Sequence, residues 1–328
     1  MIALGSVNKL LPIPGITEYA HGFRGIPEAL YLRDHVTRQL EIADAARDAA
    51  ERAARLTFVV VGAGYTGTEV AAQGPLMTAA LLKRHPRLQN EQVRWLLLDV
   101  APRVLPELSE HLSRTADRVL RKRNVEVLMG VTVRQSRADG VQLTNDTFVP
   151  THTLVWCVGV RPDPLVAGLG LPTEQGRLVV DEYLTVPGHP ELFSCGDGAA
   201  VPDLTRPGHL TGMTAQHATR QEKTAARNVA ASFGHGQRHA YRHHDLGFVV
   251  DLGGAQAAAN PIRIPLGGVP AKAVTRGYHL LAMPGNRIRT AAEWGLGAVL
   301  GRETAGLGLV RGSAVPLDSA TPQFPSKQ

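Results

Sequence analysis

The chain has few of the residues that mark several protein classes. Its 328 residues include two cysteines, Cys157 and Cys195, which lie far apart and form no C-x-x-C motif. A dithiol of the disulfide-reductase kind is therefore excluded, and so low a count is typical of a reducing compartment. Aromatic residues make up 5% of the chain. No apolar run reaches the roughly 18 residues needed to cross a membrane.

The charge balance is modestly basic. The net charge is +6 and the pI is near 9.6, which suits nucleic acid, anionic lipid or acidic cofactors. We predict no nucleic-acid partner, because the sequence has no recognised binding motif and no aromatic-rich basic run. No metal site is predicted. The length and the 44% hydrophobic content suit two globular domains.

The most informative stretch is Leu56–Glu69, LTFVVVGAGYTGTE. Its β-branched and aromatic residues, Thr57–Val61, predict a buried parallel strand. A helical pattern begins near Thr66, and between strand and helix the glycines follow the spacing G-x-G-x-x-G: Gly62, Gly64 and Gly67. This order is the context of a dinucleotide fingerprint, in which the helix N-terminus faces the pyrophosphate. A plain glycine-rich turn is the alternative.

An acidic residue supports the dinucleotide interpretation. A second predicted strand, Val93–Leu98, ends at Asp99. An acid in this place accepts hydrogen bonds from the adenosine ribose and repels a 2′-phosphate. Its distance from Gly62 exceeds the usual spacing of about 20 residues, and an enlarged loop around His85–Glu91 accounts for the excess. We therefore predict that NADH binds in preference to NADPH, although two cations lie nearby: Arg94 and Arg103.

Further elements complete a Rossmann-like domain of about 100 residues. The pattern predicts a long helix from about Pro27 to Ala54, a helix from about Ser109 to Arg123 and a strand over Val125–Met129. Turn signals predict a hairpin over residues 131–150. A buried strand over Thr153–Val158 ends at Gly159, which we predict to be a cofactor-binding glycine.

The order of these motifs resembles the type II NADH:quinone oxidoreductases, which are non-proton-pumping flavoproteins of the pyridine nucleotide-disulfide oxidoreductase superfamily. The resemblance covers nearly the whole chain and rests on VVVGAGYTGTE, on an acid before PRVLP, on LVWCVGVRP and on GRLVVDEYLTVPGHPELFSCGDGAA. It implies an α/β, two-dinucleotide-binding-domain fold with an NADH domain inserted in an FAD domain. FAD and NADH would be the cofactors, and a membrane quinone would accept the electrons.

The resemblance also implies roles for individual residues. Gly196 and Asp197 would form the second flavin motif at the end of a strand, with Asp197 bonded to the ribityl chain and a helix beginning near Gly196. An N-cap is the alternative role for Asp197. Glu69 resembles the glutamate that the family keeps near the nicotinamide, and we predict that it is catalytic. Its alternative is an acid in the first turn of a helix, favoured by the dipole.

The segment Thr214–Asn228 resembles the A-Q-x-A-x-Q stretch that lies under the flavin ring in the family. Gln216, a second predicted catalytic residue, and His217 would line the flavin ring and the quinone pocket, with Gln221 as a further quinone residue. The sequence departs from the family pattern at two places, because arginine replaces glutamine and glutamate replaces glycine: Arg220 and Glu222. An ordinary amphipathic helix is the alternative.

Near the C-terminus, apolar residues share one face at helical spacing: Ile288, Ala291, Ala292, Gly295, Leu296, Val299 and Leu300. Basic and aromatic residues flank them: Lys272, Arg276, Arg287, Arg289, Tyr278 and Trp294. This pattern is typical of a helix in the surface of an anionic membrane. The resemblance implies the same anchor, on the cytoplasmic side of the cell membrane. A core-packed helix and a homodimer contact are the alternatives.

We predict five segments: a residual part of the FAD domain with a connector (1–55), the NADH domain (56–160), the second part of the FAD domain (161–235), a membrane-associated segment (236–312) and a disordered tail (313–328). Only one G-x-G-x-x-G is present, so the chain resembles the family from the middle of the FAD domain onward. We expect Leu192–Cys195 to lack partner strands, FAD to be held weakly or not at all, and quinone reduction to be lost. A flavin-dependent NAD(P)H reductase with another acceptor and a non-enzymatic NADH-binding remnant are the alternative functions.

Overall fold

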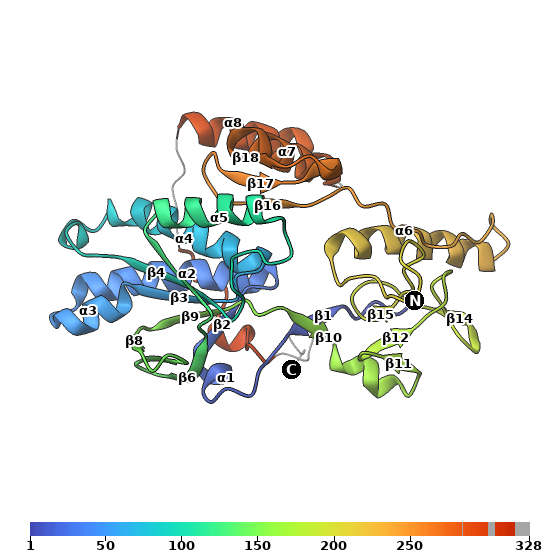
Figure 1. Cartoon of the computed structure of the whole chain (residues 1–328), viewed down its shortest axis with the longest axis horizontal. Coiled ribbons are helices and arrows are strands. Elements are labelled where there is room, and N and C mark those ends of the chain that lie inside the picture. Colours follow the sequence, from blue (N-terminus) through green and yellow to red (C-terminus); the bar gives the residue numbers. More distant parts are fainter. Residues whose placement is uncertain (284, 301–305, 319–328) are drawn as a thin grey trace. The chain divides into compact units, whose positions relative to one another are not determined.

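The computed structural model describes the whole chain except residues 284, 301–305 and 319–328 (Figure 1). Contacts between residues divide it into two compact units. The Rossmann unit comprises residues 10–159 and 246–317, and the smaller unit comprises residues 1–9 and 160–245 together with Asp318.

The Rossmann unit is built on a five-stranded parallel sheet with the order β2-β9-β3-β4-β5. Its strands, in that order, are Ala20–Gly22, Thr153–Trp156, Thr57–Val61, Arg94–Asp99 and Val125–Met129. All five residues of β3 are buried, as expected for a central strand covered on both faces. From β3 the chain continues to β4 on one side of it, whereas the later strand β9 lies on its other side. The order of the strands therefore reverses between β3 and β9. Ligands of open α/β sheets bind outside the carboxyl ends of strands at such a reversal.

Helices and a small antiparallel sheet complete the sequence-predicted part of this unit. The helices are α1 (Ile16–Tyr19), α2 (Ile26–Ala45), α3 (Ala49–Arg55), α4 (Tyr65–Leu82) and α5 (Glu110–Lys122). The small sheet holds β6 (Val133–Arg137), β7 (Gly140–Leu143) and β8 (Phe148–Pro150), so the predicted hairpin has a third strand. The predicted long helix is two helices, because the Asp48 carboxylate caps the second by accepting from the N–H groups of Ala50 and Glu51.

Helix α4 lies close to the sheet because a glycine faces the largest core side chain. The Trp95 ring stacks on Phe58 with centroids 4.6 Å apart, and its Nε1–H donates to Thr78 Oγ1 at 3.3 Å. A Cβ atom on Gly74 would lie 2.4 Å from the Trp95 ring. Any larger residue at Gly74 would therefore push α4 away from β4.

A second layer of this unit comes from the C-terminal part of the chain. Three short antiparallel strands, β16 (Val249–Asp251), β17 (Ala257–Ala259) and β18 (Leu266–Gly267), pack on α4 and α5 (Figure 1). They are followed by α7 (Gly268–Ala282) and α8 (Arg287–Val299). The guanidinium of Arg123 joins this layer to α4, because it donates to three carbonyl oxygens: Ala72, Leu252 and Gly253. No helix among the described residues has both the length and the apolar character required to span a membrane.

Residues 306–317, which we call the strap, follow α8 and pack on the α2 and sheet side of the same unit. The Gly308 N–H donates to Asp34 Oδ2 at 2.8 Å. Val315 is buried, and Leu317 is 3% exposed in a cluster that includes Ile16 and Trp156. The predicted disordered tail is therefore wrong for residues 313–317, because two apolar side chains fix them. Residues 319–328 lie outside the described part of the chain.

The smaller unit contains short strands and one long helix. Its strands are β1 (Ser6–Asn8), β10 (Val160–Pro162), β11 (Thr173–Glu174), β12 (Arg177–Val179), β13 (Thr185–Val186), β14 (His189–Phe193) and β15 (Ala199–Ala200). They pair as β1-β10, β11-β12-β15 and β13-β14. The helix is α6 (Ala215–Ser232), and a short 3-10 turn spans Pro164–Leu169.

Three sequence-based expectations for the smaller unit need correction. Residues 10–55 pack with the Rossmann unit instead, because β2 pairs with β9. The backbone around Leu192–Cys195 does find partners: β14 pairs with β13, and Ser194 bridges Ile2. No helix begins near Gly196, since Gly196 and Asp197 lie in a turn between β14 and β15.

Candidate functional site

The three fingerprint glycines meet different constraints at the carboxyl edge of β3. Gly62 has φ of +103°, and a Cβ on it would lie 2.2 Å from the Cys157 carbonyl oxygen. A Cβ on Gly67 would lie 1.8 Å from the Gly62 carbonyl oxygen. A Cβ on Gly64 would have no neighbour within 4 Å. The first and third glycines are thus needed for packing inside the protein, whereas the second borders open space that a ligand can occupy.

The start of α4 faces the same space. The helix begins at Tyr65 after Gly64, and no side chain caps its first N–H groups. Such groups carry partial positive charge and bind phosphate oxygens. Gly159, with φ of +102°, follows β9 at the same edge of the sheet, and a Cβ there would also meet no atom within 4 Å. The predicted nucleotide glycines thus follow two adjacent strands, β3 and β9.

Asp99 is held in place by the fingerprint loop. Its Oδ2 accepts from the Ala63 N–H at 2.5 Å, and its Oδ1 accepts from the Ala101 N–H at 2.8 Å. Each carboxylate oxygen keeps a second lone pair, so ribose hydroxyls can still bond to this partly exposed group. Of the nearby cations, Arg94 pairs with Glu126 and Arg103 donates to backbone carbonyls. Both arginines therefore have partners within the protein.

Glu69 belongs to a charged cluster that joins α4 to the C-terminal layer. Its Oε1 accepts from the Asp251 N–H at 2.7 Å, and the Asp251 carboxylate binds Lys272 Nζ at 2.5 and 2.6 Å. Burial raises the pKa of Glu69 to about 7, with the Asp251 charge adding to the rise and the Asp251 N–H and Lys272 opposing it. A carboxyl group so perturbed beside a ligand-binding edge is a candidate functional group.

Two members of this cluster were not predicted from the sequence. Lys272 was expected to flank a membrane helix, but it is 9% exposed and paired with Asp251. Asp251 carries no motif of its own and lies far from Glu69 in the chain, so no local pattern could identify it.

In the smaller unit, the Gly196–Asp197 turn is held by a hydroxyl and a buried cation. Asp197 Oδ2 accepts from Ser6 Oγ–H at 2.7 Å. The Arg177 guanidinium donates to the carbonyl oxygens of Ala199 at 2.8 Å and Thr211 at 2.9 Å. Burial lowers the pKa of Arg177, and the charge of Asp197 opposes that shift. The turn therefore presents a carboxylate with a fixed orientation, as a hydroxyl-bearing ligand requires.

Gln221 ties this turn to α6. Its Oε1 accepts from the Gly196 N–H at 2.8 Å, and its Nε2–H donates to Thr211 Oγ1 at 3.0 Å. The side chain is 1% exposed. Because both ends of the amide have partners inside the protein, we assign Gln221 a positioning role in place of the predicted contact with quinone.

Gln216 and His217 lie in the first turn of α6, half-buried. His217 Nδ1 is 2.9 Å from the hydroxyl oxygen of Tyr241, and its ring lies 3.9 Å from that of His243. Through Gln221 the structure brings this turn together with Gly196 and Asp197. The sequence indicated no role for Tyr241 or His243, which lie beyond the motif of α6.

Comparison with known proteins agrees with this geometry. Residues 1–221 match the pyridine nucleotide-disulphide oxidoreductase family. The chain belongs to this family. It is 31% identical over 90% of its length to the type II NADH:quinone oxidoreductase NdhA of Mycobacterium tuberculosis. It is 30% identical over 87% of its length to the demethylphylloquinone reductase NdbB of Synechocystis. It spans 65% and 66% of these two relatives.

The predicted fold is confirmed by solved structures. The chain is similar to a structure of NDH2 from Plasmodium falciparum in complex with NADH, with a TM-score of 0.79 and 17% identity over 92% of this chain and 78% of that one. A ferredoxin reductase from Rhodopseudomonas palustris gives a TM-score of 0.60 over 78% of this chain and 55% of that one, at 22% identity. The two-dinucleotide-binding-domain flavoprotein architecture of the pyridine nucleotide-disulphide oxidoreductases is therefore the fold of this chain.

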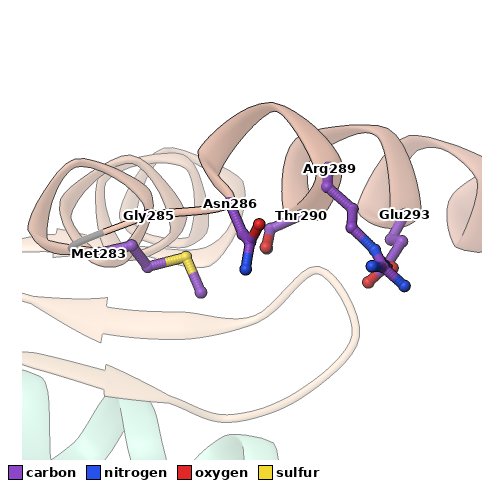
Figure 2. Close-up of a pocket in the computed structure, with 6 residues that line it drawn as sticks. All are labelled: Met283, Gly285, Asn286, Arg289, Thr290 and Glu293. Atoms are coloured by element: carbon purple, nitrogen blue, oxygen red, sulfur yellow. Dashed lines mark hydrogen bonds and ion pairs between the residues drawn. The ribbon is translucent and has the colours of Figure 1, made fainter.

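A separate hollow of about 660 Å³ lies at the turn between α7 and α8. Figure 2 shows its lining residues: Met283, Gly285, Asn286, Arg289, Thr290 and Glu293. Arg289 Nε–H donates to Glu293 Oε1 at 3.0 Å within α8. None of the predicted site residues lines this hollow, and it is open to solvent, so we do not assign it to the nucleotide or flavin site.

Substitution of the second glycine is expected to separate folding from binding. Gly64→Ala meets no atom within the protein, so its thermal midpoint should stay near that of the parent chain. NADH affinity, measured by fluorescence titration, should fall about tenfold or more, because the methyl group would occupy the pyrophosphate position. In the matched control, Gly67→Ala overlaps the Gly62 carbonyl and should cost about 1–3 kcal/mol of unfolding free energy. Unchanged NADH affinity in Gly64→Ala would place the pyrophosphate elsewhere.

Glu69 should make stability depend on pH in a defined direction. Its pKa is about 7 in the folded chain against 4.5 as the ordinary value, so the unfolded chain loses this proton first and stability falls as pH rises through that window. Glu69→Gln cannot ionise and still accepts from Asp251. The variant should therefore gain thermal stability relative to the parent at pH 8 and not at pH 4.

The exposed Glu107 provides the control for this comparison. Glu107→Gln should follow the parent curve at every pH. Parallel curves for Glu69→Gln and the parent would mean that Glu69 is ionised as easily in the folded chain as in the unfolded one.

Proposed function

We propose that this chain oxidises NADH, with FAD as hydride acceptor and a membrane quinone as electron acceptor. The observation that carries the proposal is the carboxyl edge of β3, where the open position at Gly64 and the carboxylate of Asp99 lie within one loop network. The similarity to a type II NADH:quinone oxidoreductase over 90% of the chain supports this choice of reaction.

The Rossmann unit would hold NADH through backbone and carboxylate groups. The first N–H groups of α4 would bind the pyrophosphate, and the free lone pairs of Asp99 would accept the ribose hydroxyls. A 2′-phosphate would bring negative charge against Asp99, so NADPH is disfavoured. When bound, NADH supplies a hydride from nicotinamide C4 and FAD accepts it at N5.

We assign Glu69 to the nicotinamide side of this site. Loss of a hydride leaves a positive charge on the nicotinamide ring, and an ionised carboxylate nearby would stabilise that charge. The Asp251 N–H and the Lys272 ammonium favour the ionised form of Glu69, against the effect of burial. The cluster thus keeps the group close to its point of ionisation at neutral pH.

The smaller unit has groups that suit part of FAD. The fixed carboxylate of Asp197 is suited to ribityl hydroxyls, and the positive φ of Gly196 opens the turn beside it. Gln216 and His217 would lie at the flavin ring. The 328 residues contain one G-x-G-x-x-G, which the NADH half uses, so we still expect weak affinity for the ADP half of FAD. The expected loss of quinone reduction went together with missing partner strands at Leu192–Cys195, and this segment is paired. We therefore propose quinone reduction when FAD is in excess.

We also propose that α8 docks on an anionic membrane surface, on the cytoplasmic side where NADH is available. None of its residues is buried, and Ile288 and Val299 are 88% and 83% exposed. Basic groups border this apolar face, and the Arg276 guanidinium lies 5.0 Å from the centre of the Trp294 ring. An interfacial helix with cationic edges binds anionic lipid in this way.

The reaction is tested by mixing the purified chain with excess FAD, NADH and a short-chain quinone under anaerobic conditions. Quinone-dependent NADH oxidation supports the proposal. If the chain reduces ferricyanide but does not reduce quinone, it is a flavin reductase with another acceptor. Binding of NADH without any turnover would indicate a non-enzymatic NADH-binding chain and overturn the proposed reaction.

Cofactor choice should depend on the charge of Asp99. NADH is expected to bind at least about tenfold more tightly than NADPH, since two like charges near 4 Å cost about 1–4 kcal/mol at intermediate dielectric. Asp99→Asn removes the charge, but its amide nitrogen replaces one of the two oxygens that accept from the Ala63 and Ala101 N–H groups. The ratio of the NADH and NADPH affinities, and not either affinity alone, should therefore show the loss of repulsion by moving toward one. Equal affinities in the parent chain, measured by fluorescence titration, would refute this role for Asp99.

Membrane docking should require the exposed face of α8. The double variant Ile288→Asp/Val299→Asp should no longer sediment with vesicles containing anionic lipid, and high salt should weaken sedimentation of the parent. Phe233→Asp, which changes an equally exposed apolar residue at the end of α6, serves as the control and should sediment normally. If the double variant changes only the oligomeric state, α8 forms a homodimer contact and the docking proposal fails.

A further inference from the structure

A buried tyrosine hydroxyl contacts the histidine at the start of α6. Tyr241 is 2% exposed, and its hydroxyl oxygen lies 2.9 Å from His217 Nδ1 and 3.5 Å from His243 Nδ1. Within the described residues, His217 Nε2 makes no hydrogen bond. The two ring nitrogens of His217 therefore have different surroundings, one inside the protein and one available to a ligand.

The segment that carries Tyr241 is held on α6 by Arg220. The guanidinium of Arg220 donates to the His244 carbonyl oxygen and lies 3.3 Å from His243 Nδ1. Arginine at this position was one of the two departures from the family pattern. Its contacts explain the substitution, since they fix residues 241–244 against the first turns of α6 and bring the Tyr241 hydroxyl to His217.

The electrostatic surroundings keep His217 neutral. Its pKa is lowered to about 4, first by burial and then by the neighbouring His243, Arg220 and Arg177, while the charge of Asp203 opposes the shift. Burial also raises the pKa of Tyr241, so the phenol keeps its proton. A phenol hydroxyl can donate to an unprotonated imidazole nitrogen. Of the two nitrogens near the Tyr241 hydroxyl, His217 Nδ1 is the closer, and His243 Nδ1 also faces the Arg220 guanidinium. A bond from Tyr241 to His217 Nδ1 places the imidazole proton of His217 on Nε2.

We propose that Tyr241 fixes His217 as the Nε2–H tautomer and that this N–H donates to a carbonyl oxygen of the quinone. The inference rests on the proposed reaction and adds a catalytic residue, His217, and a positioning residue, Tyr241. His217 would thus recognise a planar diketone, whose carbonyl oxygen gains negative charge when the ring is reduced.

A neutral donor at this place suits the reaction. When the quinone ring receives a hydride, one carbonyl oxygen becomes an oxyanion, and an N–H already aimed at it stabilises the transition state more than the ground state. At functional sites, the second ring nitrogen of a histidine is often bonded to a neighbouring side chain, which fixes the ring orientation and the tautomer. Tyr241 has this role for His217.

The first test is the tautomer itself, observed by two-bond nitrogen–proton NMR of the histidine rings in the protein without ligand. His217→Asn identifies the signal by its loss. The parent chain should show His217 protonated at Nε2, and Tyr241→Phe should show a mixture of tautomers. Tyr183→Phe, at a half-buried tyrosine of the same unit, is the matched control and should leave the signal unchanged. A proton on Nδ1 in the parent, or no change in Tyr241→Phe, overturns the proposal whatever the activity.

The second test compares two electron acceptors with FAD in excess. Ferricyanide accepts electrons but has no carbonyl oxygen that an N–H could stabilise. The ratio of quinone turnover to ferricyanide turnover therefore measures the effect of the His217 N–H on quinone reduction alone. Tyr241→Phe should lower this ratio about tenfold through kcat, and Tyr183→Phe should not. A purely structural role for Tyr241 would lower both turnovers together and leave the ratio unchanged, which also overturns the proposal.

The two tests distinguish this inference from the proposed function. If the parent chain reduces no quinone, the proposed reaction fails and the donor role fails with it. If the parent reduces quinone and the ratio is the same in Tyr241→Phe, only the role of Tyr241 and His217 is wrong.

Discussion

The close approach of α4 to the parallel sheet is the constraint on which the Rossmann unit depends. At its start, Gly67 leaves no space for a side chain against the Gly62 carbonyl, and about two turns further along, Gly74 lies against the Trp95 ring. Two contacts on one helix fix both its distance from β3 and its direction. The N–H groups at its start, which no side chain caps, are therefore aimed at the carboxyl edge of the sheet, and Glu69, one turn into the helix, reaches the C-terminal layer.

Local patterns allowed the centre of the fold to be predicted. The run Thr57–Val61, the fingerprint glycines and the position of Asp99 all follow from residues close together in the sequence, and the observed β3, α4 and β4 agree with them. Residues 10–22 could not be placed in the same way. Strand β2 is three residues long, and its membership of the sheet depends on β9, more than 130 residues later.

The candidate sites were predictable to a similar degree. Motifs indicated the glycines, Asp99, Glu69 and Asp197, because each lies at the end of a recognisable strand or glycine turn. Contacts between distant segments determine the rest: Asp251 and Lys272 beside Glu69, and Tyr241 beside His217. A motif can also suggest a role that the structure does not support. The sequence position of Gln221 indicated a contact with a ligand, whereas its amide bonds to Gly196 and Thr211 inside the protein.

The strap gives the C-terminal layer a second attachment. On one side, Arg123 and Asp251 connect β16 and the following turn to α4 and α5; on the other, Asp34 and the pocket around Leu317 hold the chain that follows α8. A helix resting on a lipid surface experiences lateral drag and thermal undulation of the bilayer. If α8 docks on a membrane as proposed, its two attachments divide such mechanical load between α4 and α2, and neither attachment alone bears the whole torque.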